Sequence, residues 1–298
     1  MFRGSIPALI TPFKENGEID FTSFRNLLHL HLRESSDALL ISGSTGEAST
    51  LTTEEFSSLL SFAVQEIKGN IPVIAGTGSN STKKAIEKTL LAKNLGANAA
   101  LILIPGENLP QEEGIFLHFQ KINEINFPYI VYYNPSRGSS YISQQGLFKI
   151  SHLKNCIGFK LSVNKMGSFR EFLDLVCHHS NVWHGNDDKF LQENFLGNFS
   201  GSFSIVANQF PKFWKKIVDF SLNNQKEQAL ALYKKIQPFL RAILLEVNPQ
   251  GIKHSLAHQG LCKDILRAPL MPVKKETQEE IHAELKNFLQ QIYIDALN

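Results

Sequence analysis

Short runs of apolar residues alternate with longer amphipathic stretches along most of the chain. Two amphipathic stretches carry helix-end signals: residues 52–66 open on the capping-box sequence Thr52-Thr53-Glu54-Glu55, and residues 81–95 stop at Gly96. The apolar runs have the length of strands and lie at 6–11, 38–42, 73–75, 99–104, 129–132, 157–160, 182–185 and 201–205. Strands that each precede a helix predict an α/β fold, the closed (β/α)8 TIM barrel.

Helical patterns continue after the last predicted strand. They cover 211–223, 226–247 and 276–296, which is more helix than closing a barrel requires. We therefore expect a single domain over residues 1–298, with a C-terminal helical extension from about 209 to 298 that serves oligomerisation. An open dinucleotide-binding sheet is the alternative, but it needs a Gly-x-Gly-x-x-Gly turn after the first strand, where this chain reads Thr11-Pro12-Phe13-Lys14.

Composition and charge exclude several classes of function. Of the 298 residues, 43% are hydrophobic and 19% charged, and the net charge of +2 comes without a recurring stripe of Lys and Arg, which argues against a nucleic-acid partner. No apolar run is long enough to span a membrane and no signal sequence is visible, so we expect no membrane partner and a cytoplasmic location. Three scattered cysteines do not make a disulfide framework or a zinc site: Cys156, Cys177 and Cys262.

Lys160 is the first candidate for chemistry, because active sites of TIM barrels lie at the carboxyl ends of the strands. Strand alternation puts Gly158 and Lys160 on one face of the sixth strand and Ile157, Phe159 and Leu161 on the other. If the apolar set packs on the helices, Lys160 points into the barrel, where desolvation lowers its pKa from about 10.4 and frees the amine to act as a nucleophile. The alternative is a lysine at the strand rim with its ammonium group in water.

Two other strand ends carry polar groups suited to a carboxylate substrate. The loop Gly43-Ser44-Thr45-Gly46-Glu47 offers hydroxyls and backbone N–H groups, although alone it also fits an ordinary Gly/Ser turn. After the fifth strand, Arg137 can grip a carboxylate with its guanidinium, and either Tyr132 or Tyr133 faces the barrel interior, where a phenol can shuttle protons. A buried aromatic residue followed by a surface arginine is the ordinary interpretation of that segment.

The remaining polar residues are expected to be mainly structural, with Gly185 as the exception. Gly185 offers backbone contacts to a substrate, but Asp187 and Asp188 have no third ligand at metal spacing, so we expect them to cap the following helix and expect no metal. The histidines away from the predicted strand ends are expected to be surface or packing residues: His178, His179, His254 and His258.

Taken in order, these motifs resemble the dihydrodipicolinate synthase family, which belongs to the pyruvate-dependent class I aldolases together with N-acetylneuraminate lyase. The resemblance spans nearly the whole chain, and the ordered set is specific although no single motif is. Its members are Phe2-Arg3-Gly4-Ser5-Ile6, Thr11-Pro12-Phe13, residues 43–47 and 72–78, Pro135-Ser136-Arg137, Gly158-Phe159-Lys160, Gly185, Asn248-Pro249 and residues 266–270.

The resemblance implies a reaction. Lys160 would form a covalent imine with pyruvate, without any separate cofactor, lose a proton to give an enamine and attack aspartate 4-semialdehyde. The product, 4-hydroxy-tetrahydrodipicolinate, would serve lysine and diaminopimelate biosynthesis. The expected partners are these small substrates and further copies of the chain, in a homodimer or homotetramer.

The resemblance also assigns roles to residues. Tyr132 would be the proton shuttle, with Ser44 next to it in the relay, and Thr45 would hold the pyruvate carboxylate. Arg137 would receive the carboxylate of the second substrate. The remaining substrate-binding residues would be Gly185 and Phe203.

Several positions depart from the family pattern. The sequence Pro105-Gly106-Glu107-Asn108 stands where the family has Pro-Tyr-Tyr-Asn, so the tyrosine that completes the relay across a dimer contact is absent and Glu107 is its candidate substitute. The motif Tyr-Asn-x-Pro is changed to Tyr132-Tyr133-Asn134-Pro135, which favours Tyr132 as the shuttle and leaves Tyr133 open. Positions that bind lysine in feedback-inhibited bacterial enzymes also differ, so we predict weak or no inhibition by lysine; they are Thr53, Phe56, Lys84 and Gly106.

Two other functions stay open. Residues 43–48 also resemble the lyase form of that loop, which fits an aldolase acting on N-acetylneuraminate or a 2-keto-3-deoxy-sugar acid. The missing relay tyrosine motivates the other alternative, a catalytically impaired barrel with a binding role.

Overall fold

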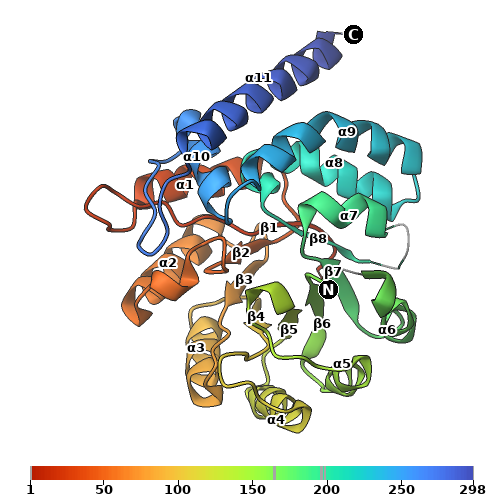
Figure 1. The fold of residues 1–298 in the computed structure, drawn as a ribbon. Helices are drawn as coiled ribbons and strands as arrows, with labels where there is room; N and C mark the ends of the chain where they lie inside the picture. The colour runs from red at the N-terminus through yellow and green to blue at the C-terminus, as the bar shows by residue number, and fades with distance from the viewer. Residues whose placement is uncertain (1, 164–165, 195–196, 198, 298) are drawn as a thin grey trace.

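Eight parallel strands form a nearly closed barrel in the computed structural model, which describes residues 2–163, 166–194, 197 and 199–297 (Figure 1). The strands are β1 (Gly4–Pro7), β2 (Leu39–Ile41), β3 (Val73–Gly76), β4 (Ala99–Leu103), β5 (Tyr129–Tyr133), β6 (Cys156–Leu161), β7 (Asn181–His184) and β8 (Gly201–Ser204). The predicted TIM barrel is therefore confirmed. The first strand lies earlier than the predicted 6–11, and the other predicted strands overlap the observed ones closely.

The ring of strands is completed differently on the two sides of β1. Strands pair in the order β1-β8-β7-β6-β5-β4-β3-β2, with Gly4 opposite Gly201. On its other side β1 meets β2 through the single bridge between Ala8 and Leu40. The side chain of Asn208 extends the β1–β8 seam, because its amide donates to Ala8 O at 2.7 Å and accepts from Ile10 N at 2.9 Å.

Helices follow the strands around the outside of the barrel (Figure 1). They are α1 (Phe21–Arg33), α2 (Thr53–Ile67), α3 (Thr82–Asn94), α4 (Glu112–Asn123), α5 (Gln144–Ser151), α6 (Arg170–Val176), α7 (Asp187–Asn194) and α8 (Pro211–Leu222), with short 3-10 helices η1 (Ala48–Thr50), η2 (Pro135–Arg137), η3 (Met166–Phe169) and η4 (Val206–Asn208). The predicted capping box of α2 is confirmed, since Thr52 and Glu55 exchange side-chain and backbone hydrogen bonds. Gly96 follows α3 with a φ of 89°, as a helix stop requires.

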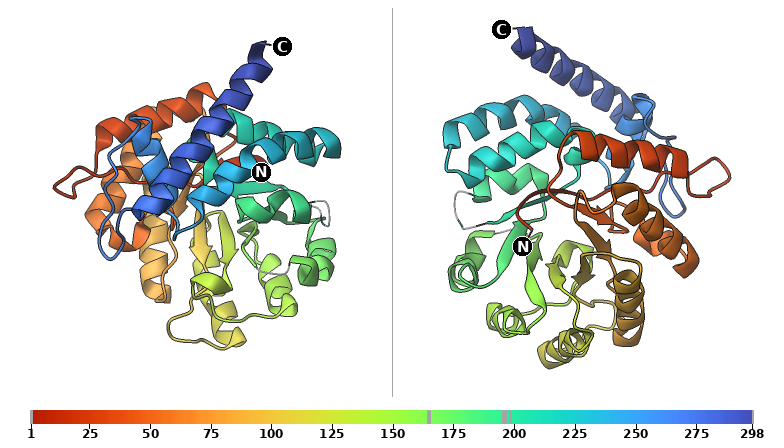
Figure 2. Two further views of the ribbon diagram at one scale, coloured as in Figure 1. Left: turned by 45° about the horizontal axis from the view of Figure 1, so that its top comes forward. Right: turned by 180° about the vertical axis from the view of Figure 1, so that it is seen from behind.

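Three further helices form an extra layer on the side of the barrel that carries α1 and α8 (Figure 2). They are α9 (Lys226–Ile243), α10 (Gln250–His258) and α11 (Lys275–Leu297), whose C-terminal end extends away from the barrel. Helix α8 packs on β1 and β8, and α9 is the first helix of the extra layer; a single domain with an extension from about 209 to 298 stays a prediction. Helix α10 was not predicted. Of the helices in the described part of the chain, none has both the length and the apolar character that crossing a membrane requires.

The barrel interior is filled by apolar side chains separate from those that pack against the helices. The interior cluster includes Ile6, Leu40 and Ile74, and Ile157 packs against it. The expectation that Ile157 faces the helices is wrong, because the register between β5 and β6 shifts next to Tyr129 and inserts one residue. Beyond this bulge the predicted alternation holds, with Phe159 and Leu161 in the outer core.

Candidate functional site

Lys160 lies on β6 with its side chain inside the barrel, so the rim alternative does not apply. It is only 7% exposed, and its Nζ atom lies 4.2 Å from the ring centre of Tyr132 and 5.1 Å from that of Phe203. Burial lowers the pKa of Lys160 below that of an ordinary lysine; Tyr132 and Asp187 oppose this shift and Arg137 adds to it. The structure therefore gives the amine the desolvated surroundings that a nucleophilic lysine needs.

Gly185 provides the space that the Lys160 stem occupies. A Cβ atom at Gly185 would lie 3.0 Å from Lys160 Cε and 2.0 Å from Ser162 Oγ. The backbone N–H of Gly185 donates to Leu161 O at 2.8 Å. A larger residue directly after β7 would have to displace the side chains of Ser162 and Lys160.

Of the two adjacent tyrosines, Tyr132 is the one beside Lys160. Tyr132 and Lys160 are register partners on β5 and β6, whereas Tyr133 packs in the outer core against Phe169, with ring centres 6.0 Å apart. The pKa of Tyr132 lies below its ordinary value: burial alone would raise it, but neighbouring polar groups outweigh burial, namely Lys160, Ser162, Asn134 and Arg137. The Asn134 amide donates to the phenol oxygen at 2.7 Å. A phenol in this setting releases its proton more readily than a free tyrosine.

The loop after β2 holds Thr45 and Ser44 in different surroundings. Thr45 is buried, and its hydroxyl accepts a hydrogen bond of 2.9 Å from the side-chain amide of Asn248. Ser44 is exposed, and within the described residues its hydroxyl makes no hydrogen bond with Tyr132. The single chain therefore brings Thr45 into a bonded network and leaves Ser44 at the surface.

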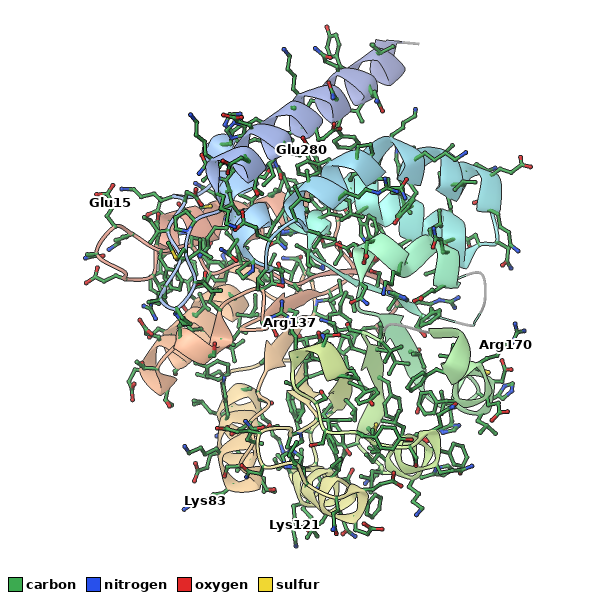
Figure 3. All side chains as sticks on the ribbon, in the orientation of Figure 1. Glu15, Lys83, Lys121, Arg137, Arg170 and Glu280 are labelled. Carbon is green, nitrogen blue, oxygen red and sulfur yellow. The ribbon has the colours of Figure 1, made fainter. Side chains whose placement is uncertain are left out.

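Arg137 lies on η2, and Figure 3 shows it in the inner part of the molecule, unlike Glu15 or Lys83 at its edge. Its side chain is exposed and donates to Asn248 O at 3.1 Å. Arg137 also affects the pKa of both Lys160 and Tyr132, which places its charge within electrostatic range of the buried amine. A guanidinium here is open to a carboxylate from solvent.

The segment that departs most from the expected pattern is packed tightly against η2. A Cβ atom at Gly106 would lie only 1.2 Å from Gly138 O, so no side chain fits at this position without moving the loop after β5. Glu107 is exposed, and its carboxylate accepts from the Asn80 amide at 2.9 Å rather than from Tyr132. A relay through Glu107 of another copy of the chain stays a prediction.

Comparisons with known proteins agree with this geometry. The family model described as the dihydrodipicolinate synthetase family matches residues 1–288. The chain belongs to this family. Among its relatives, the 4-hydroxy-tetrahydrodipicolinate synthase of Pseudomonas putida (strain W619) is 33% identical over 287 residues, which cover 96% of this chain and 98% of the relative. The corresponding synthase of Aquifex aeolicus (strain VF5) is 34% identical over 290 residues, which cover 97% and 98%.

Solved structures of the dihydrodipicolinate synthetase family superpose on nearly the whole chain. The crystal structure of dihydrodipicolinate synthase from Aquifex aeolicus has a TM-score of 0.93 at 34% identity and covers 96% of this chain and 98% of that one. The chloride-inhibited dihydrodipicolinate synthase from Acinetobacter baumannii, complexed with pyruvate, has a TM-score of 0.94 at 31% identity and covers 97% and 99%. The fold and the family are therefore established by independent comparisons.

Asp187 binds a segment that its place in the sequence does not indicate. The expectation that Asp187 caps α7 is wrong. Its carboxylate accepts from the Ser204 hydroxyl at 3.0 Å and from the backbone N–H groups of Ile205 and Val206 at 2.7 and 2.9 Å. Burial raises the pKa of Asp187 to about 6. Asp187 thus ties β7 to η4 and supplies a partial counter-charge to Lys160.

A buried ion pair supports the loop that carries Thr45. The carboxylate of Glu47 pairs with the ammonium group of Lys253 on α10, and both side chains are fully buried. Glu47 also accepts from Arg267 N at 2.9 Å, and Lys253 donates to Ile265 O at 2.9 Å. No group of three or more His, Cys, Asp or Glu side chains in the described ranges is arranged to hold a metal ion.

Proposed function

We propose that Lys160 forms an imine with pyruvate and that the derived enamine condenses with aspartate 4-semialdehyde to give 4-hydroxy-tetrahydrodipicolinate. The observation that carries this proposal is the buried amine of Lys160 between Tyr132 and Phe203, in a family whose relatives are 4-hydroxy-tetrahydrodipicolinate synthases. The chain is accordingly a lyase of the class I aldolase type. The product belongs to lysine and diaminopimelate biosynthesis.

The reaction needs a neutral amine and a group that moves protons next to it. Burial favours the neutral form of Lys160, which attacks the ketone carbon of pyruvate, and Tyr132 protonates the oxygen that leaves as water. Tyr132 then takes a proton from the methyl group of the imine to give the enamine, whose carbon bonds to the aldehyde carbon while Tyr132 returns that proton to the aldehyde oxygen. The amino group of the second substrate then displaces Lys160 from the imine, which closes the ring and frees the enzyme.

The remaining residues take binding roles in this proposal. Thr45 and its loop bind the pyruvate carboxylate, and Gly185 and Phe203 line the space around the reacting carbon. Arg137 binds the carboxylate of the aldehyde with its exposed guanidinium. Ser44 takes the relay position next to Tyr132 in this proposal, and Glu107 completes the relay from another copy of the chain, which makes activity dependent on assembly.

We further propose that the protein works as a homodimer or homotetramer in the cytoplasm, without a separate cofactor. A variant of a relative is described as the first monomeric dihydrodipicolinate synthase, which supports assembly as the usual state in the family. The imine on Lys160 itself supplies the electron sink that a cofactor would otherwise provide.

Trapping with borohydride tests this function. The protein is incubated with pyruvate and borohydride, digested, and its peptides are mapped by mass. We expect a stable adduct on Lys160 and none on Lys253, a second buried lysine, which serves as an internal control. A folded protein that gives no adduct on Lys160 would show the proposal to be wrong.

Turnover rates with different aldehydes distinguish the synthase from the other aldolases, because all of them form the same imine with pyruvate. Aspartate 4-semialdehyde is expected to be turned over faster than the aldehydes that correspond to sialic acid or 2-keto-3-deoxy-sugar acids, because the exposed Arg137 suits a short carboxylated aldehyde. The second alternative, a catalytically impaired barrel with a binding role, is supported only by Gly106 and Glu107, which stand where the family has the two tyrosines. It would give the pyruvate adduct without turnover of any aldehyde.

A further inference from the structure

Asn248 connects the two residues that are expected to bind the two substrate carboxylates. Its side-chain amide donates to the hydroxyl of Thr45 at 2.9 Å, and its backbone carbonyl accepts from the guanidinium of Arg137 at 3.1 Å. Asn248 comes from the connection between α9 and α10, so the extra helical layer supplies a residue to the barrel mouth. It touches both substrate-binding residues and lies between them.

The side-chain carbonyl of Asn248 is an unused acceptor at this place. Its Oδ1 atom is buried and, within the described residues, has no hydrogen-bond partner. An amide oxygen has two lone pairs, and a ligand or water can donate to such an atom where the protein does not. The atom can therefore accept a hydrogen bond from a donor that the described residues do not supply.

Only one of the two substrates offers a cationic donor. Pyruvate carries a ketone and a carboxylate, both acceptors, and a carbonyl oxygen repels them. The aldehyde substrate carries an ammonium group next to its carboxylate. A carboxylate on Arg137 and an ammonium group on the adjacent amide oxygen would satisfy both ends of an amino acid, and the ammonium group would be kept away from the guanidinium.

We propose that Asn248 determines specificity for an amino-acid aldehyde by accepting a hydrogen bond from its ammonium group through Oδ1. This inference rests on the proposed function and adds to it a residue that tells the amino aldehyde from the same aldehyde without the amino group. Asn248 takes no part in bond making, and its contribution is binding of the second substrate only.

The test compares two aldehydes that differ only in this group. Aspartate 4-semialdehyde and succinate semialdehyde share the aldehyde and the carboxylate, and the second has hydrogen in place of the ammonium group. The pyruvate imine is formed first, each aldehyde is added in a single-turnover experiment, and the rate constant for consumption of the imine is read by borohydride quench and mass. The ratio of the two rate constants measures recognition of the ammonium group alone.

The substitution Asn248→Leu is expected to lower this ratio at least about tenfold, because a hydrogen bond to a charged group is lost for one aldehyde only. Asn248→Asp is expected to keep or raise the ratio, since a carboxylate attracts the ammonium group more strongly. Thr45→Val is the matched control: it removes the same Thr45–Asn248 bond but leaves Oδ1 in place, so it should slow both aldehydes and leave the ratio unchanged.

An unchanged ratio in Asn248→Leu overturns the inference. If that variant does not fold, a ratio that falls in Asn248→Asp overturns it instead. Failure of the proposed function is distinct, because the wild-type protein would then form no pyruvate imine on Lys160, or an imine that neither aldehyde consumes.

Discussion

Replacing only one residue of the ion pair between Glu47 and Lys253 should destabilise the protein much more than replacing both residues. Both side chains are fully buried, and the pair joins the loop of Thr45 to α10. Lys253→Met keeps the length of the stem but leaves the carboxylate of Glu47 with a single hydrogen bond, from Arg267 N. Glu47→Gln leaves the buried ammonium group without its counter-charge.

The size of the effect follows from desolvation. An uncompensated buried charge costs about 3–5 kcal/mol, while replacing a whole buried pair by neutral groups of similar size is often neutral. For a chain of this length that cost corresponds to a fall in Tm of roughly 10 °C. The double variant Glu47→Gln/Lys253→Met should recover most of this loss, because neither charge then remains in the interior.

Thermal unfolding followed by circular dichroism measures the effect. Glu18→Gln is the control, because it removes an exposed ion pair with Lys14 and should leave Tm unchanged. Burial already lowers the pKa of Lys253, and loss of Glu47 lowers it further, so the unfolded state binds more protons and the stability of Glu47→Gln should rise with pH up to about 10.4. Two results would refute the argument: single variants with unchanged Tm, or a double variant whose loss in Tm equals the sum of the losses of the two single variants.

Four more outcomes are expected. Tyr132→Phe should slow turnover by roughly 100- to 10,000-fold in a coupled assay, and the pyruvate adduct on Lys160 should be trapped only after longer incubation because imine formation is slowed too; wild-type turnover would contradict the shuttle role. The value of kcat/KM for pyruvate should reach its plateau at a pH below about 10.4, because burial lowers the pKa of Lys160, and a profile that still rises there would disagree. Gly106→Ala should raise KM for the aldehyde more than KM for pyruvate, since it displaces the loop that carries Arg137; equal changes in steady-state kinetics would argue against this. Lysine at millimolar concentration should inhibit weakly or not at all, because Lys84 repels a cationic effector, and strong inhibition in the same assay would reverse the prediction.

The sequence predicted the barrel because buried parallel strands give short apolar runs that stand out between helices. The position of Lys160 inside the barrel followed from the alternation of residues along β6. The orientation of Ile157 was predicted wrongly, because the bulge at the start of β6 arises from pairing with β5 and is not visible in the sequence of β6. Helix α10 was missed because it is short and rich in polar residues.

Contacts in the site between residues far apart in the chain could not be predicted from the sequence. The carboxylate of Asp187 follows a strand and precedes a helix, which is also the pattern of a cap, but its partners lie after β8. The sequence marks Asn248 only as part of a family motif, and its contact with Thr45 joins residues 203 positions apart. Long-range contacts of this kind depend on the completed barrel, so local spacing does not encode them.

The seam between β1 and β8 has a consequence for how the protein is made. Ile10 and Asn208 are 198 positions apart, so the amino-terminal strand emerges from the ribosome long before its hydrogen-bonding neighbour has been synthesised. Until then the growing chain presents two unpaired strand edges, the state in which sheets recruit other chains and aggregate. Shortened translation products that end before Gly201 are therefore expected to depend on chaperones or be degraded, however well the earlier strand-helix units form.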